Sequence, residues 1–157
     1  MMRLPALLLF VLALLLNACG QQEPLKIGFI GGLSDRNSDN GQSGLNGVML
    51  AVEQFNRNGG IDGRVVELVA RDDAQRRETA ENSAKELVAA GVEAVIGPFT
   101  SSMAEVIVPI TGQAGIFQIS PTVTSMAFYG KDDNFFRINR TTRDNAQEYA
   151  KIMVGRS

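Results

Sequence analysis

Two hydroxyl-rich segments carry the side chains best suited to binding a small ligand. The first, Thr100-Ser101-Ser102, follows the apolar run Ala94–Ile96 and a Gly-Pro turn. This order predicts a buried strand that ends where a helix begins. Hydroxyl groups there can cap the free N–H groups of the first helical turn, and those N–H groups and the helix dipole also suit a small anion. Ser101 fits either role, a plain helix cap or a ligand contact.

The second segment repeats the pattern. Thr122 and Thr124 follow another apolar run, residues 116–119, and the pair Ser120-Pro121. The carboxyl ends of neighbouring parallel strands meet at one edge of a sheet, so we expect a single polar crevice lined by both segments. A polar loop after Pro121 with no ligand is the alternative reading of Thr122 and Thr124.

Other chemistry has little support in the sequence. Asp72 and Asp73 end a predicted strand and are candidates for a metal site or a catalytic carboxylate pair. No third acidic residue is placed to assist them, and the chain has no His and one Cys. A catalytic histidine, an internal disulfide and a cysteine metal cluster are therefore excluded. We predict a protein that is not an enzyme and uses no cofactor or metal.

The composition limits the number of domains and the classes of binding partner. The 157 residues are enough for about one domain. Fifteen basic and 17 acidic residues are interspersed, give a net charge of −2 and form no basic stripe. This balance argues against nucleic acid as a partner.

The crevice must be positioned by alternating strands and helices. Hydrophobic periodicity predicts an α/β fold, a parallel sheet with helices on both faces. A Ser/Asp/Asn-rich loop over residues 33–40 should precede the first helix, and Pro109 should kink or end the helix that begins near Ser102. The predicted strands are 26–30, 65–70, 94–96, 116–119 and 134–137, and the predicted helices begin near residues 41, 77, 102 and 141–144.

The N-terminus has the pattern of a secretory signal. Residues 1–3 are a short positive start, and residues 4–16 form an apolar run that is too short to span a bilayer. The sequence Leu-Asn-Ala-Cys that ends at Cys19 resembles a bacterial lipobox. That resemblance implies a signal peptide over residues 1–18, lipidation of Cys19 and a tether over residues 19–24. An ordinary cleaved signal with an incidental Cys is the alternative.

Several motifs, in this order and spacing, resemble one known family. They are KIGFIGGLS (26–34), GQSGLNG (41–47), LAVEQFNRNGGIDGR (50–64), ELVARDDA (67–74), VIGPFTSS (95–102) and ISPTVT (119–124). The resemblance is to the N-terminal part of the leucine/isoleucine/valine-binding family of type I periplasmic solute-binding proteins. It implies two hinged lobes, of which residues 25–139 form a Rossmann-like ligand-binding N-lobe. Residues 140–157 would begin a second lobe that is otherwise missing from this chain.

The same resemblance implies roles for four residues. Ser101 would hold the ligand carboxylate, the backbone carbonyl of Thr122 would accept from the ligand ammonium, and Thr124 would add a second hydroxyl. Asn40 falls where branched-chain amino acid binders usually carry an aromatic residue. Its presence there suggests a smaller or more polar ligand. A cap of the following helix is the alternative role of Asn40.

The implied function is that of a lipid-anchored receptor outside the cytoplasm, on the periplasmic or cell-surface side. It would bind an amino acid or a related small carboxylate and deliver it to the membrane permease of an ABC importer. The alternative is a ligand-sensing module of the same fold that reports to a receptor or signalling partner.

Overall fold

A five-stranded parallel sheet forms the centre of the computed structural model, which describes residues 22–34 and 38–155. The strand order is β2-β1-β3-β4-β5, and every neighbouring pair is parallel. The α/β prediction is thereby confirmed, and all five carboxyl ends lie at one edge of the sheet. The strands are β1 (Leu25–Gly31), β2 (Val66–Asp72), β3 (Ala94–Ile96), β4 (Phe117–Ser120) and β5 (Phe135–Arg137).

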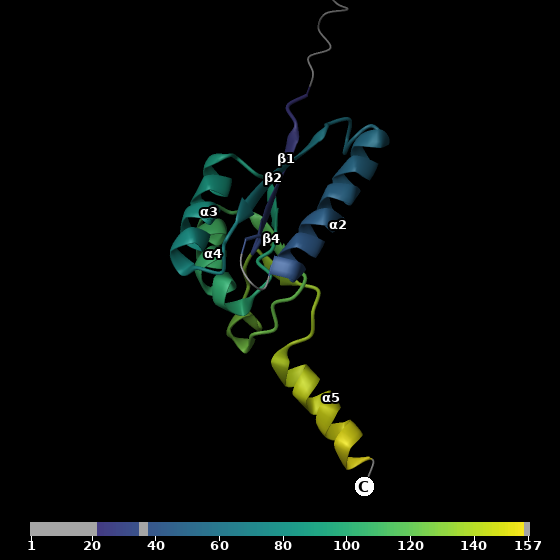
Figure 1. Ribbon diagram of the computed structural model, residues 1–157, viewed down its shortest axis with the longest axis vertical. Helices are drawn as coiled ribbons and strands as arrows, with labels where there is room; N and C mark the ends of the chain where they lie inside the picture. The colour runs from purple at the N-terminus through teal and green to yellow at the C-terminus, as the bar shows by residue number, and fades with distance from the viewer. Residues whose placement is uncertain (1–21, 35–37, 156–157) are drawn as a thin grey trace, which may run out of the picture.

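Helices lie on both faces of the sheet, as predicted (Figure 1). On one face are α3 (Arg77–Ala89) and α4 (Ser101–Gln113), and on the other is α2 (Ser38–Arg57). A short 3-10 helix, η1 (Met126–Phe128), lies between β4 and β5. The last helix, α5 (Thr142–Val154), extends away from the sheet (Figure 1).

The main core fills the space between the sheet and the pair α3 and α4. It is made of small and branched apolar side chains, which let the helices approach the sheet closely. Burying them supplies most of the favourable free energy of folding for this half of the molecule. Its buried members are Ile30, Ala80, Ala84, Leu87, Val92, Val95, Met103, Ile107 and Ile116.

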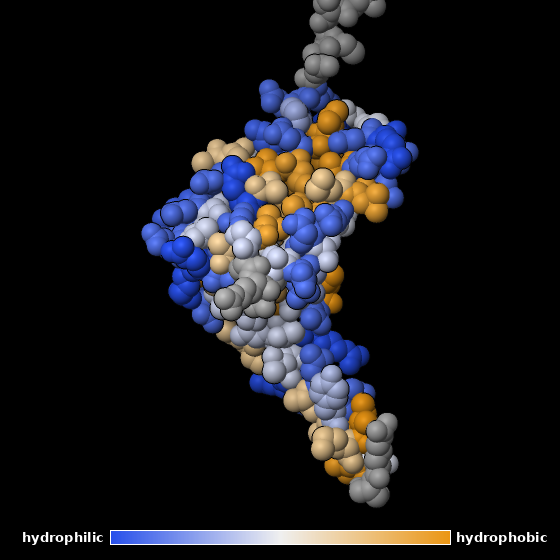
Figure 2. All heavy atoms as spheres, viewed as in Figure 1, coloured by the Kyte–Doolittle hydropathy of each residue, from blue (hydrophilic) through white to orange (hydrophobic). Residues whose placement is uncertain are grey.

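The opposite face of the sheet is only partly covered. Phe117 and Phe136 stack on each other with ring centroids 5.0 Å apart, yet they are 44% and 50% exposed. Figure 2 shows apolar side chains gathered around α2 and the neighbouring sheet, and again at the far end of α5. The exposed residues of α5 include Tyr149, Met153 and Val154. No residue of α5 is buried, so this helix adds no side chain to the core of the described chain.

The predicted start of the first helix was wrong, and of the two outcomes predicted for Pro109, a kink or a helix end, the helix end does not occur. The first helix begins at Ser38, so Asn40 lies in its first turn and neither in a loop nor at a cap. The helix can start this early because Gly41 packs on the Gly32 backbone, where an added Cβ would lie 2.0 Å from the carbonyl oxygen. Pro109 does not end α4, which continues to Gln113. Pro109 has no N–H to donate to the carbonyl four residues earlier in the helix. Because Pro109 is exposed, water can donate to that carbonyl instead.

The start of α5 was predicted more closely. Thr141 and Asp144 form a capping box, in which each side chain bonds the backbone N–H of the other residue. Residues 1–18, Cys19 and the first part of the predicted tether lie outside the described residues. Within the described ranges, no helix is long and apolar enough to cross a membrane.

Candidate ligand-binding site

The two hydroxyl-rich segments lie at neighbouring strand ends. β3 and β4 pair in register from Ala94 opposite Phe117 to Ile96 opposite Ile119, so the loops that follow them are adjacent. The hydroxyl of Thr122 donates to the carbonyl of Phe99 at 2.6 Å, and that of Ser120 donates to the carbonyl of Pro98 at 2.6 Å. These bonds join the loop after β4 to the loop after β3.

Ser101 and Thr124 keep their hydroxyl groups open. Both residues are part-buried, and among residues 22–34 and 38–155 neither hydroxyl forms a hydrogen bond. Ser101 is the first residue of α4, and the hydroxyl of the preceding residue, Thr100, caps no backbone N–H of the first helical turn, although it lies 3.4 Å from the Ser102 hydroxyl. Free N–H groups and a free hydroxyl at a helix start can bind a carboxylate.

Thr122 and Asn40 border one hollow beneath α2, with a volume of about 560 Å³. Most of the hollow is apolar, and its lining includes Val48, Val52, Phe99, Ile119 and Pro121. The carbonyl of Thr122 is approached by Asn139 Nδ2 at 3.5 Å. Ser101 and Thr124 do not line this hollow. The structure therefore places Asn40 and Thr122 on one hollow, Ser101 at the start of α4 and Thr124 on the loop after β4.

The carboxylate pair Asp72 and Asp73, at the end of β2, forms hydrogen bonds that hold the neighbouring loops. Asp72 Oδ1 accepts from the backbone N–H groups of Leu33 and Ala74, each at 2.8 Å. Partial burial opposes ionisation of Asp72, but bonds from the Ser34 hydroxyl and from the backbone of Leu33, Ala74 and Ser34 outweigh it and lower its pKa. The described residues contain no cluster of acidic, His or Cys side chains that could hold a metal ion.

Gln75 was not identified from the sequence. Its Nε2 donates to Asp73 Oδ1 at 2.9 Å, and its Oε1 accepts from the Thr100 hydroxyl at 3.0 Å. It therefore joins the loop after β2 to the start of α4, across the end of β1. The position of Gln75 just past a strand end was a usable signal, because all five strands end at this edge.

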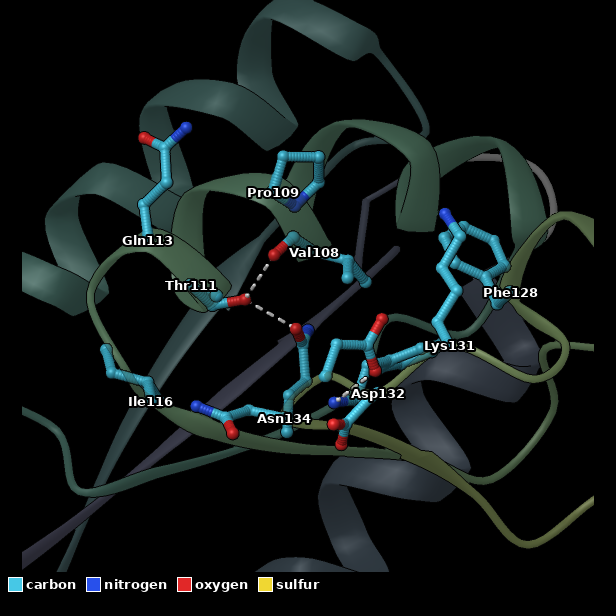
Figure 3. Close-up of a pocket in the computed structure, with 13 residues that line it drawn as sticks. Val108, Pro109, Thr111, Gln113, Ile116, Phe128, Lys131, Asp132 and Asn134 are labelled. Carbon is cyan, nitrogen blue, oxygen red and sulfur yellow. Dashed lines mark hydrogen bonds between the residues drawn. The ribbon is translucent and has the colours of Figure 1, made fainter.

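A second cavity of about 530 Å³ lies between α4 and the segment that leads into β5 (Figure 3). Its central polar groups are already bonded to protein. The Thr111 hydroxyl donates to Gln118 Oε1 at 2.6 Å, and Gln118 Nε2 donates to the Gly97 carbonyl at 3.0 Å. Lys131, at its rim, lies over the Phe128 ring. Other polar side chains, among them Gln113, Asp132 and Asn134, line the rest of the cavity.

A parallel sheet with open hydroxyls at adjacent strand ends defines a class of α/β protein that binds small ligands at this edge. Residues 24–157 match the family model described as periplasmic binding protein. The chain belongs to this family. It is similar to branched-chain amino acid-binding members.

Relatives support that placement. The Leu/Ile/Val-binding protein BraC3 of Rhizobium johnstonii is 32% identical over 101 residues, which cover 64% of this chain and 28% of the relative. The Leu/Ile/Val-binding protein of Escherichia coli K12 is 31% identical over 120 residues, 76% of this chain and 33% of the relative. The chain thus spans about a third of the length of these relatives.

A solved structure shows the same fold. The branched-chain amino acid transporter substrate binding protein LivJ of Streptococcus pneumoniae, in complex with isoleucine, superimposes with a TM-score of 0.72 and 32% identity. The match covers 75% of this chain and 34% of that one. The predicted family and fold class are therefore confirmed, and these relatives are substrate-binding proteins.

Proposed function

We propose that the protein is a substrate-binding protein of an ABC importer and that its ligand is an amino acid or a related small carboxylate. The observation that carries this proposal is the pair of open hydroxyls, Ser101 and Thr124, at adjacent strand ends of a periplasmic binding protein fold. The names of the relatives, which refer to leucine, isoleucine and valine, support the same ligand class.

In the proposed binding geometry, the protein contacts both the carboxylate and the ammonium group of an amino acid. The ligand carboxylate accepts from Ser101, from Thr124 and from the free N–H groups at the start of α4. The Thr122 carbonyl accepts from the ligand ammonium, displacing the long contact from Asn139. Binding needs no proton transfer or covalent step, in keeping with a protein that is not an enzyme.

The ligand side chain would occupy the part of the hollow bordered by Asn40. An exposed amide at the start of α2 adds a hydrogen-bonding group to an otherwise apolar lining. This arrangement favours a side chain that is smaller or more polar than leucine. Residues 25–139 would form the first lobe and residues 140–157 the start of the second. Closure of two lobes on the ligand would then favour the form that a permease recognises.

We also propose that Cys19 anchors the protein by a lipid on the outer side of a membrane, after removal of residues 1–18. The support is the lipobox-like sequence and the single Cys of the chain. The intact mass of the protein from native membranes tests this point. The expected mass is that of a chain starting at Cys19 plus a diacylglyceryl group and a fatty acyl group, and replacing Cys19 by Ser should release the protein.

Calorimetric titration tests the ligand. The protein expressed from its complete native reading frame is titrated with leucine, valine, alanine, threonine and serine. We expect saturable binding of at least one of them and a loss of about tenfold or more for Ser101→Ala, because a hydrogen bond to a charged group contributes about 1.5–3 kcal/mol. Ser43→Ala, on the exposed surface of α2, is the matched control. Equal affinity for both variants would contradict the assigned role of Ser101.

A further inference from the structure

We propose that Gln75 is a positioning residue of the ligand site. Its side chain holds the Thr100 hydroxyl off the backbone N–H groups at the start of α4 and so keeps these N–H groups available to the ligand. The inference rests on the proposed function. It assigns Gln75 an effect that runs through Thr100, without contact between Gln75 and the ligand.

Two threonines of this chain occupy the same position at a helix start and behave differently. Thr141, before α5, has φ −73° and ψ 160°, and its hydroxyl accepts from the backbone N–H of Asp144 at 3.2 Å. Thr100, before α4, is also extended, with φ −129° and ψ 149°, but it makes no such bond. Its hydroxyl donates to Gln75 Oε1, outside the helix, at 3.0 Å and lies 3.4 Å from the Ser102 hydroxyl. The Thr141 hydroxyl donates to Asp144 Oδ2, within the helix that it caps. Threonine at this position ordinarily caps its helix, so the exception at Thr100 needs a cause.

Gln75 is held in place by Asp73, and its position explains why Thr100 does not cap α4. Its backbone N–H and its Nε2 both donate to Asp73 Oδ1, at 2.8 and 2.9 Å, and Asp73 is fully buried. Ala74 and Gln75 have φ +47° and +51°, which turn the loop sharply. With the Nε2 end of the amide fixed on Asp73, the Oε1 end points to Thr100.

Gln75 prevents Thr100 from competing with the ligand for the N–H groups at the start of α4. A capping hydroxyl and a ligand carboxylate would use the same N–H groups of the first turn of α4. If Thr100 were released, it could cap the helix, and the ligand would have to displace it. Such a cap is worth roughly 1 kcal/mol, so affinity should fall about fivefold.

A double-substitution experiment separates this effect from general bracing of the loop. Four proteins from the complete native reading frame are titrated with the amino acid that binds the unsubstituted protein best: unsubstituted, Gln75→Met, Thr100→Val and the double variant. Met keeps the length of Gln without its amide, and Val keeps the shape of Thr without its hydroxyl. Gln75→Gly is a second variant at this position, since Gly readily adopts a φ of +51°.

We expect Gln75→Met and Gln75→Gly to weaken binding about fivefold when Thr100 is present. In the Thr100→Val background, which has no hydroxyl to compete, replacing Gln75 should change affinity less than twofold. An equal loss in both backgrounds, or no loss in either, would overturn the inference while leaving the proposed function intact. An unsubstituted protein that binds none of the amino acids would overturn the proposed function, and this inference with it.

Discussion

Asp72 Oδ1 and the backbone N–H of Leu33 are joined by a hydrogen bond of 2.8 Å, although the two residues are 39 positions apart in the sequence. The bond ties the loop after β2 to the loop after β1. The same oxygen accepts from Ala74, which shapes the loop that leads to Gln75. A carboxylate that the sequence offers as a candidate for catalysis thus organises the edge of the sheet at which we place the ligand.

The first prediction concerns the pH dependence of this carboxylate. Because the folded state lowers the pKa of Asp72, its ionised form stabilises the fold above the pKa of the unfolded chain. That contribution is lost as the pH falls through the lower, folded-state pKa. Asp72→Asn should therefore be less stable than the unsubstituted protein at pH 7, and the difference should shrink below about pH 4. Urea unfolding at several pH values measures it.

Asp39→Asn is the control for this experiment, because Asp39 is an exposed residue in the first turn of α2. Its effect on the free energy of unfolding should be small, since surface substitutions usually stay within about 0.5 kcal/mol. A stability difference for Asp72→Asn that stays constant from pH 7 to pH 3 would show that the charge of Asp72 has no part in it.

The second prediction concerns the buried pair Thr111 and Gln118. Gln118→Leu removes the donor to the Gly97 carbonyl and leaves that acceptor buried, at a cost of about 1–3 kcal/mol. Thr111→Val should destabilise the fold as well, because it leaves Gln118 Oε1 buried without its hydrogen-bond donor. A double-mutant cycle by urea unfolding should give a coupling free energy above about 0.5 kcal/mol. Strict additivity would mean that the 2.6 Å bond between them contributes no net stability.

The third prediction concerns Gly97, which has φ +115°. A Cβ there would lie 2.0 Å from the carbonyl oxygen of Ile30, in the backbone of the neighbouring strand. Gly97→Ala should therefore destabilise the fold by about 3 kcal/mol or more, since both the conformation and the contact are unfavourable. Thermal unfolding followed by circular dichroism measures the loss.

Gly112→Ala provides the matched comparison for Gly97→Ala. Gly112 lies in α4, and nothing is within 4 Å of an added Cβ. Ala there should stabilise the protein by about 0.5–1 kcal/mol. Similar melting temperatures for the two variants would contradict the close approach of Gly97 to β1.

The fourth prediction concerns the partly covered face of the sheet. Phe117→Thr with Phe136→Thr removes two stacked and half-exposed rings from this face. For the chain of 157 residues, we expect less binding of a hydrophobic dye and less self-association in light scattering, because exposed apolar patches promote both. Replacing the buried Phe29 should instead unfold the protein. Unchanged dye binding in the double variant would show that this face is not the exposed apolar surface.

The fold was more predictable from the sequence than the site. Apolar runs such as residues 94–96 and stop signals such as Gly91 are local, so strands and helices could be placed within a few residues. The start of α2 was misplaced because it depends on Gly41 packing against Gly32, a contact that no local pattern reveals. The link from Gln75 to Thr100 was missed for the same reason, since it joins residues 25 positions apart.

Ser101 and Thr124 could be selected from the sequence because parallel strands bring their ends to one edge. The sequence does not show which of these hydroxyl groups lack a hydrogen-bond partner in the folded chain. Thr122 has the same chemistry, yet its hydroxyl donates to the Phe99 carbonyl, and its own carbonyl accepts from Asn139 Nδ2.

The most direct measurement is a crystal structure of the protein from its complete native reading frame, grown with the amino acid that it binds best. The account predicts the ligand carboxylate within hydrogen-bonding distance of Ser101 Oγ, Thr124 Oγ1 and the first N–H groups of α4, with the ammonium on the Thr122 carbonyl. A ligand bound elsewhere, such as the cavity between α4 and β5, or one whose carboxylate does not contact Ser101, would contradict it.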